Sequence, residues 1–316
     1  MPIQSVQVTI LRNMGNLLSI YLSRCSRAVA GKYRSRALLC LLCAFSSASL
    51  VAMEQQEPLV LGVFPRRSVQ ATTEIFTPLV KYLSRKLNRE VRLETTHDFA
   101  SFWDMVEHKR YDIVHFNQYH YLRSHKELGY QVIAQNEEFG QSKIAGAIVV
   151  RTDSGINSLQ DLRGKKIVFG GDRLAMQAYI AASYLLRQAG LKPGDYFEQF
   201  ALNPPKAAIA TFYQQAVAAG TGDHVLQLPR VKGEIDIDKM KYLAIGQPLA
   251  HLPWAVKAEL PSKVTQDIAS LLIGLNQQLE GKEILKQLQL TNILPANDSD
   301  YNDHRHIIKT VLNEEL

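Results

Sequence analysis

Cysteine is missing from most of this chain, and its absence sets the first limits on the protein. The three cysteines, Cys25, Cys40 and Cys43, all lie within the first 52 of 316 residues. Those 52 residues also hold six of the 36 Lys and Arg side chains and none of the 30 Asp and Glu. Residues 53–316 therefore keep 30 basic against 30 acidic side chains. Disulfides and a thiol nucleophile are excluded there, and the balanced charge argues against a nucleic-acid partner.

The basic residues of this N-terminal part precede an apolar run from Ala37 to Phe45, and small residues follow it. This layout is typical of a secretory signal peptide. The run up to Ala52 is shorter than the roughly 20 residues that a membrane helix needs. We therefore predict that residues 1–52 are a leader cleaved after Ala48 or Ala52, and that the protein is exported to the periplasm. An uncleaved N-terminal membrane anchor is the alternative.

Residues 53–316 lack an apolar stretch long enough to cross a bilayer, and they alternate short strand patterns with helix patterns. Strands are predicted over 58–63, 112–116 and 224–228, and a helix over 207–219. This alternation is typical of an α/β fold in which helices flank mostly parallel sheets. Because no low-complexity linker interrupts it, we predict two lobes joined by crossover strands. Lobe 1 is formed by residues 57–150 plus 250–316, and lobe 2 by residues 151–249.

Sequence motifs for catalysis are missing as well. The chain has no Gly-x-Ser-x-Gly, no His-Glu-x-x-His and no Gly-x4-Gly-Lys pattern. His115, His120 and His125 are five residues apart, which places them on different sides of a helix, unlike the four-residue pair of a metal site. We therefore predict a protein that is not an enzyme and that has no cofactor and no metal site. A Ser/His/acid triad assembled by the fold stays open as the alternative.

Four segments carry a family resemblance. They are Leu-Gly-Val-Phe-Pro at 61–65, Tyr-Asp-Ile-Val-His-Phe at 111–116, Ser-Leu-Gln-Asp-Leu-Arg-Gly-Lys-Lys-Ile-Val-Phe-Gly at 158–170, and Ala-Val-Lys-Ala-Glu-Leu-Pro at 255–261. In this order they resemble the substrate-binding proteins of phosphate/phosphite/phosphonate ABC transporters. The resemblance covers roughly residues 58–285. It implies the two-lobed, type 2 periplasmic-binding-protein fold.

The resemblance also implies a function. We expect the exported protein to capture a small anionic solute, such as phosphate or a phosphonate, between its lobes. Hinge closure would then present the loaded form to an ABC transporter permease. We expect a monomer that meets the membrane only through its leader or its partner. Two alternatives stay open: a sensor that presents its ligand to a membrane histidine kinase, and a binder of a carboxylate, a zwitterion or a metal.

The predicted binding residues lie in loops after the strands, because ligands of open α/β sheets bind at the carboxyl ends of the strands. The resemblance implies a hydroxyl-rich oxyanion loop, but the chain has Leu174, Ala175 and Met176 in that region. Basic side chains and a helix start are expected to replace the hydroxyl groups. The predicted set is Phe64, Arg66, Arg67, Asn117, Tyr119, Gly171, Asp172, Arg173, Met176 and Lys206. For the charged members, a solvated or salt-bridged position is the alternative.

Overall fold

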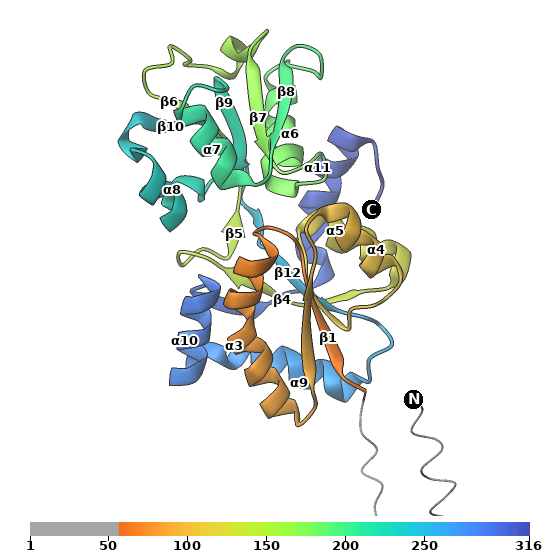
Figure 1. The fold of residues 1–316 in the computed structure, drawn as a ribbon. Helices are drawn as coiled ribbons and strands as arrows, with labels where there is room; N and C mark the ends of the chain where they lie inside the picture. The colour runs from red at the N-terminus through yellow and green to blue at the C-terminus, as the bar shows by residue number, and fades with distance from the viewer. Residues whose placement is uncertain (1–56) are drawn as a thin grey trace, which may run out of the picture. The chain divides into compact units, whose positions relative to one another are not determined.

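The computed structural model describes residues 57–316, so the predicted leader and its cleavage site lie outside the described residues. Two sheets dominate the fold, each in its own lobe (Figure 1). The first has the order β13-β4-β12-β3-β1-β2. Its strands are β1 (Leu59–Val63), β2 (Val91–Thr95), β3 (Ile113–His115), β4 (Gln131–Glu137), β12 (Pro253–Val256) and β13 (Asn292–Pro295).

The second sheet has the order β10-β6-β9-β7-β8. Its strands are β6 (Gly146–Arg151), β7 (Lys166–Gly170), β8 (Phe197–Ala201), β9 (Ala218–Gly222) and β10 (Met240–Ile245). Both sheets are mixed. The pairs β1–β2, β1–β3, β7–β8 and β7–β9 are parallel, and the remaining pairs of the two sheets are antiparallel. The prediction of an α/β fold is confirmed, but the predicted parallel pairing holds for only part of each sheet.

Helices cover both faces of the first sheet. They are α3 (Val69–Leu87), α4 (Phe99–Glu107), α5 (Gln118–Leu128), α9 (Ser262–Ile273) and α10 (Leu279–Leu288). Neighbouring residues of β3 point to opposite faces. Ile113 packs in a core with α3, α9 and α10, whereas Val114 packs in another core with α4 and α5. The loops at the strand ends are thereby held between two packed layers.

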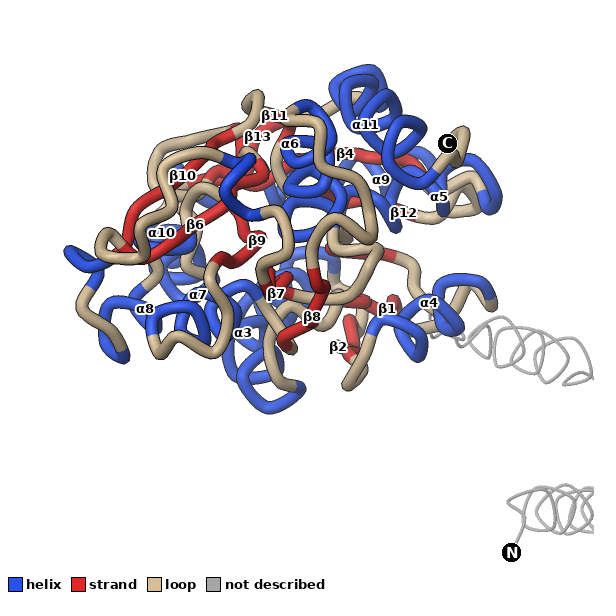
Figure 2. Tube along the Cα trace, turned by 90° about the horizontal axis from the view of Figure 1, so that it is seen from above, coloured by secondary structure: helices blue, strands red, loops and turns tan. Residues whose placement is uncertain are grey.

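The second lobe contains a π-helical turn, η2 (Met176–Ala181), that continues into α6 (Ala182–Gln188). Its other helices are α7 (Pro204–Phe212) and α8 (Pro229–Glu234). The C-terminal helix α11 (Asn302–Leu312) lies beside both α5 and α6 (Figure 2) and so contacts both lobes. Short 3-10 turns are η1 (Leu159–Leu162), η3 (Val225–Gln227), η4 (Ile237–Lys239), η5 (Gly274–Gln277) and η6 (Asp298–Tyr301).

The chain crosses between the lobes at a two-stranded ribbon of β5 (Lys143–Ile144) and β11 (Leu249–Ala250). Strand β6 pairs with β9 and β10, so the second sheet begins at Gly146. The predicted boundary at 150/151 is therefore placed too late, because it assigns nearly all of β6 to lobe 1. No helix among the described residues is long and apolar enough to cross a membrane.

Two predicted elements of lobe 2 are wrong. The helix expected over 207–219 ends at Phe212, and Ala218–Gly222 forms the buried strand β9. The strand expected over 224–228 is the 3-10 turn η3. A Cβ on Gly220 would lie 2.4 Å from the carbonyl oxygen of Ala178, so this strand needs small residues to fit under η2. The alanines that favour a helix locally are used here for close packing.

Candidate functional site: a cleft between the lobes

The candidate site is a cleft that residues of both lobes line. Lobe 1 contributes the loops after β1 and β3, with Phe64, Arg66 and Asn117. Lobe 2 contributes the loops after β7, β8 and β9. The parallel strands of both sheets thus direct their carboxyl ends at one space, which is where open α/β sheets bind ligands.

The walls of this cleft are mostly apolar. Ring and aliphatic side chains such as Phe64, Phe99, Ile144 and Leu252 line it, and no described residue of the lining is Ser, Thr or Tyr. The polar side chains of the lining are Arg66, Asn117, Gln118, Gln177, Asn203 and His224. The hydroxyl groups that the resemblance implies for an oxyanion loop are therefore missing from the whole cleft, as well as from residues 171–176.

Asn117 joins the two lobes across the cleft. Its Oδ1 accepts from the backbone N–H of His120 at 3.1 Å, which caps the start of α5. Its Nδ2 donates to the backbone carbonyl oxygen of Leu174 in lobe 2, also at 3.1 Å. One buried side chain therefore both fixes a helix of lobe 1 and holds the lobe 2 loop against it.

The loop after β7 positions the start of a helix at the cleft. Gly171 has a φ of 125°, a conformation that suits glycine, and it turns the chain out of the strand. The Asp172 carboxylate accepts from the backbone N–H of Leu174 at 2.9 Å, and burial raises the pKa of this carboxyl. The first residues of the helical segment that begins at Met176 line the cleft, and their backbone N–H groups have no acceptor within the helix.

Gln177, on that first turn, is 9% exposed, and neither polar atom of its side chain has a hydrogen-bond partner among residues 57–316. Buried amides are normally paired, because leaving one unpaired costs about 1–3 kcal/mol. The side chain belongs to the cleft lining. Its two polar atoms are therefore without a partner at the wall of the cleft.

A buried ion pair forms one wall of the cleft. The guanidinium of Arg66 donates to both carboxylate oxygens of Glu138, at 2.6 and 3.3 Å. Burial by itself raises the pKa of Glu138, but the charges of Arg66, His251 and Arg67 outweigh it and lower that pKa to about 2. Glu138 is thus ionised at neutral pH, and the charge of Arg66 is cancelled locally.

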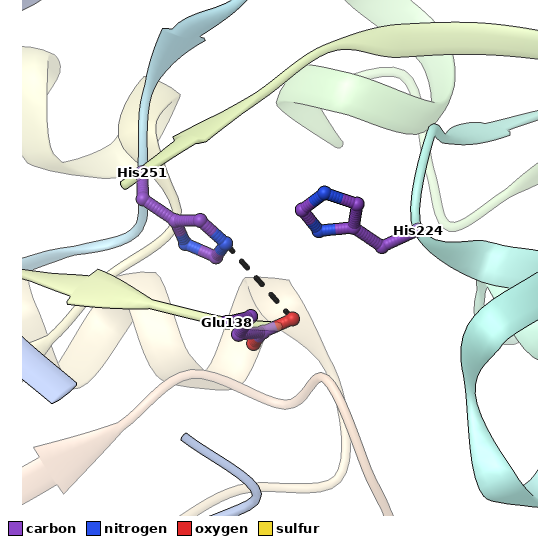
Figure 3. Close-up of side chains that lie close together, drawn as sticks. All are labelled: Glu138, His224 and His251. Carbon is purple, nitrogen blue, oxygen red and sulfur yellow. Dashed lines mark ion pairs between the residues drawn. The ribbon is translucent and has the colours of Figure 1, made fainter. Parts of the chain in front are cut away.

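Glu138, His251 and His224 lie close enough to suggest a metal site. One ligand atom from each lies within 4.8 Å of the others, and all three side chains are buried (Figure 3). His251 Nδ1 accepts from the backbone N–H of Leu252 at 2.8 Å, so the neutral ring carries its proton on Nε2, the atom that faces Glu138. That proton and the adjacent guanidinium of Arg66 both oppose a cation here. The ionised Glu138 is thus held by Arg66, and His251 Nε2 lies 3.9 Å from its carboxylate, too far for a hydrogen bond.

Five of the predicted site residues come together at the cleft, and five do not. Those that line it are Phe64, Arg66, Asn117, Gly171 and Met176. Asp172 caps the loop, and Arg67 donates to Gln289 at a neighbouring opening that it shares with Arg66.

The side chains of the other three predicted residues are directed elsewhere in this structure. The Tyr119 hydroxyl donates to the Glu314 carboxylate at 2.7 Å. Arg173 donates to the Tyr179 hydroxyl at 2.8 Å and pairs with Glu198, so it lies over the edge of β8. Lys206 sits on the side of α7 that faces away from the cleft, in a surface groove with Tyr213.

Sequence reasoning missed four functional candidates: Glu138, Gln177, His224 and His251. Gln177 had a usable signal, since it directly follows Met176 in the predicted loop. The other three had none. They follow β4, β9 and β11, and only the crossover of the chain brings them together.

Comparisons with known proteins agree with this geometry. The family described as the periplasmic substrate-binding protein of phosphonate ABC transporters matches residues 61–301. A binding-protein component of an ABC phosphonate transporter from Pseudomonas aeruginosa superposes with a TM-score of 0.71 at 15% identity, covering 81% of this chain and 86% of that one. PhnD1 from Prochlorococcus marinus, solved with methylphosphonate, gives 0.72 at 17% identity, covering 81% and 98%. These structures confirm the predicted two-lobed, type 2 fold.

A curated relative comes from a different class of protein. The tetrathionate sensor histidine kinase TtrS of Salmonella typhimurium is 28% identical over 199 residues, which cover 61% of this chain. The match spans only about a third of the kinase, 33% of its length.

Proposed function

The chain belongs to the family of periplasmic substrate-binding proteins of phosphonate ABC transporters, and from this premise we propose that it captures a small anionic solute in the cleft between its lobes. The loaded protein then docks on an ABC transporter permease, which takes up the solute. The protein itself carries out no chemistry on its cargo. The two lobes act as the closing halves, and the chain crosses between them at β5 and β11.

The observation that carries this proposal is that both lobes line one cleft and already touch across it through Asn117 and Leu174. A solute that contacts both walls binds the closed form better than the open form, so it shifts the equilibrium toward closure. Glu138 neutralises Arg66, so Arg67, at the neighbouring opening that it shares with Arg66, leaves one net positive charge beside this wall. The helix start of lobe 2 adds a partial positive charge on the other side, which favours an anion.

The test is thermal unfolding in a panel of phosphate, phosphite, methylphosphonate, sulfate, tetrathionate, small carboxylates and amines. At a concentration of 100 Kd a ligand stabilises the folded state by about 2.7 kcal/mol. For a domain of this size that corresponds to a rise in Tm of about 5–10 °C. We expect such a rise with an anion, and a response to amines alone would contradict the proposal.

Two charge variants test whether the anion that raises Tm binds in the cleft. Arg67→Gln removes the net positive charge of the wall, and we expect it to weaken the anion several-fold. Arg92→Gln is the matched control, since Arg92, on β2, is exposed and paired with Glu90. Equal affinity in both variants would show that the anion binds elsewhere.

A sensor is the second candidate function, and the similarity to a sensor histidine kinase favours it. In that case the same closed lobes would present the solute to a membrane kinase instead of a permease. Cross-linking of the loaded protein in native membranes distinguishes the two by the partner recovered.

We also propose that residues 1–52 direct export to the periplasm, as their basic, apolar and small-residue order indicates. Mass spectrometry of the exported protein is expected to find an N-terminus between residues 47 and 56. An intact Met1 would overturn the proposed cleavage.

A further inference from the structure

We propose that the solute is an organic anion with one charged end and an apolar body of several carbons, and that Gln177 binds its charged end. This inference rests on the proposed function, because it assumes that the cleft is the solute site. It goes beyond that function by naming the chemical class of the solute and the side chain that selects it.

The polar side chains of the cleft divide into committed and uncommitted groups. Arg66 is bound to Glu138, Asn117 to Leu174 and His120, Gln118 to the carbonyl oxygen of Ala250, and Asn203 caps α7. The remaining two, Gln177 and His224, both have buried polar atoms without a hydrogen-bond partner among residues 57–316. Both belong to lobe 2, so the polar end of the solute is expected on that side.

Gln177 is the better placed of the two for an anion. It lies on the first turn of the continuous helical segment Met176–Gln188, where the backbone N–H groups have no acceptor within the helix. The amide Nε2 adds donors next to these N–H groups, and the helix dipole adds partial positive charge. A carboxylate or sulfonate accepts hydrogen bonds from both sources.

The rest of the cleft suits an apolar body. Phe64, Phe99 and Leu252 from lobe 1 face Val225 and Leu228 from lobe 2, with no hydroxyl group between them. A compact inorganic oxyanion has oxygens on every side, and those that faced these side chains would lose water without gaining a hydrogen bond. A hydrocarbon body meets the same walls favourably, because its burial removes apolar surface from water.

The charged groups of the cleft favour a solute with one negative charge over a solute with two. Arg66 is the one arginine or lysine among the described side chains that line it, and Glu138 already neutralises it, whereas Arg67 lies at the neighbouring opening. The helix start supplies a partial charge of about half a unit. A second negative end on the solute would have no counter-charge inside the cleft.

The test is calorimetry with two series of singly charged organic anions: methane-, butane- and hexanesulfonate, and acetate, butanoate and hexanoate. Sulfate and phosphate are measured beside them as compact inorganic anions. We expect affinity to rise about fourfold with each methylene that the cleft buries. Sulfate or phosphate binding at least as tightly as butanesulfonate and butanoate would overturn the inference while leaving the proposed function intact. Absence of binding by every anion, compact or organic, would overturn the proposed function itself.

Three variants test the assignment of the two ends. Gln177→Ala is expected to weaken every organic member tenfold or more and to keep the dependence on chain length. Val225→Thr replaces a methyl by a hydroxyl of similar size and is expected to lower the chain-length dependence. Gln188→Ala, at the exposed end of the same helix, is the control and is expected to change nothing. Unchanged affinity in Gln177→Ala, with the unfolding temperature of the empty protein preserved, would overturn the role of Gln177.

Discussion

At the scale of single residues, burial decides which histidines carry charge. His115, His120 and His304 are fully buried, and this desolvation lowers the pKa of each to about 3. Burial also lowers the pKa of His251, to about 4, although Glu138 opposes the shift. All four rings are therefore neutral in the folded protein at any pH above about 5.

Lowering the pH is therefore expected to destabilise the protein already at pH values well above those at which carboxylates titrate. Below pH 6.5 the unfolded chain binds protons at these four histidines and the folded chain does not, so stability falls as pH falls toward their folded pKa values. The expected loss is about 1–2 kcal/mol per histidine between pH 6.5 and 5. Urea unfolding at a series of pH values measures it.

Two variants identify the source of that acid sensitivity. His304→Met removes one buried imidazole, so the dependence on pH is expected to become shallower by about one proton. His97→Met, at an exposed position, is expected to leave it unchanged. A stability that stays constant from pH 6.5 to 5 would show that these rings are protonated in the folded protein.

Glu138 contributes in a different pH window. Because its folded pKa lies near 2, below the ordinary value of 4.5, its stabilisation is present above pH 4.5 and is lost as pH falls through 2. The histidine effect and the carboxylate effect therefore separate along one titration.

The same residues show what sequence alone predicts. Arg66 is found because an arginine after a buried strand lies at a sheet edge whatever the rest of the fold. Its partner Glu138 is 72 positions away, and no local pattern connects the two. For Arg173 the local pattern is misleading. It follows a strand end as predicted, but Glu198 on the adjacent strand holds it away from the cleft.

At the scale of elements, periodicity predicts the helices well where one face is apolar. Helix α3 buries Phe76, Leu79 and Leu83, which recur at three- and four-residue spacing, and Ser68 caps its start. The helix predicted over the residues of β9 is wrong, because the packing at this strand requires small residues. Alanine and glycine fit under η2, and their helix-forming spacing carries no information about that contact.

Close packing at the end of β7 gives a prediction at this scale. A Cβ on Gly170 would lie 2.3 Å from the Cα of Pro204, at the start of α7. Backbone atoms cannot yield as a side chain does, so Gly170→Ala is expected to cost about 3 kcal/mol. Gly233→Ala in α8 meets nothing within 4 Å and is expected to stabilise by up to about 1 kcal/mol. Urea unfolding compares the two, and equal effects would contradict the packing argument.

At the scale of the whole molecule, the two lobes share one continuous core. Buried residues of β3 in lobe 1 and of β6 and β7 in lobe 2 belong to the same cluster, and α11 extends it. Arg187 of α6 also donates to the carbonyl oxygens of Thr310 and Val311, both at 2.8 Å. The lobes are thus firmly packed together beside α11, and closure depends in addition on contacts across the cleft.

Asn117 is a contact across the cleft that a single substitution tests. Asn117→Asp keeps the Oδ1 that caps α5, so lobe 1 is expected to keep its stability. The second carboxylate oxygen replaces the amide that donates to Leu174, and it faces a carbonyl oxygen without a proton between them. The closed form loses a hydrogen bond and gains a repulsion, which together are worth about 1–3 kcal/mol.

The apparent affinity for a solute falls by the fraction of molecules that still close, so Asn117→Asp is expected to weaken binding about tenfold or more. Small-angle scattering of the empty variant is expected to give a larger radius of gyration than the wild type, and saturating solute is expected to restore the smaller value. His108→Asp, at the exposed end of α4, adds a negative charge to the same lobe without touching lobe 2 and serves as the control. If Asn117→Asp binds as tightly as that control, the closed state does not depend on the bridge between Asn117 and Leu174, and the lobes are held by the packing beside α11 alone.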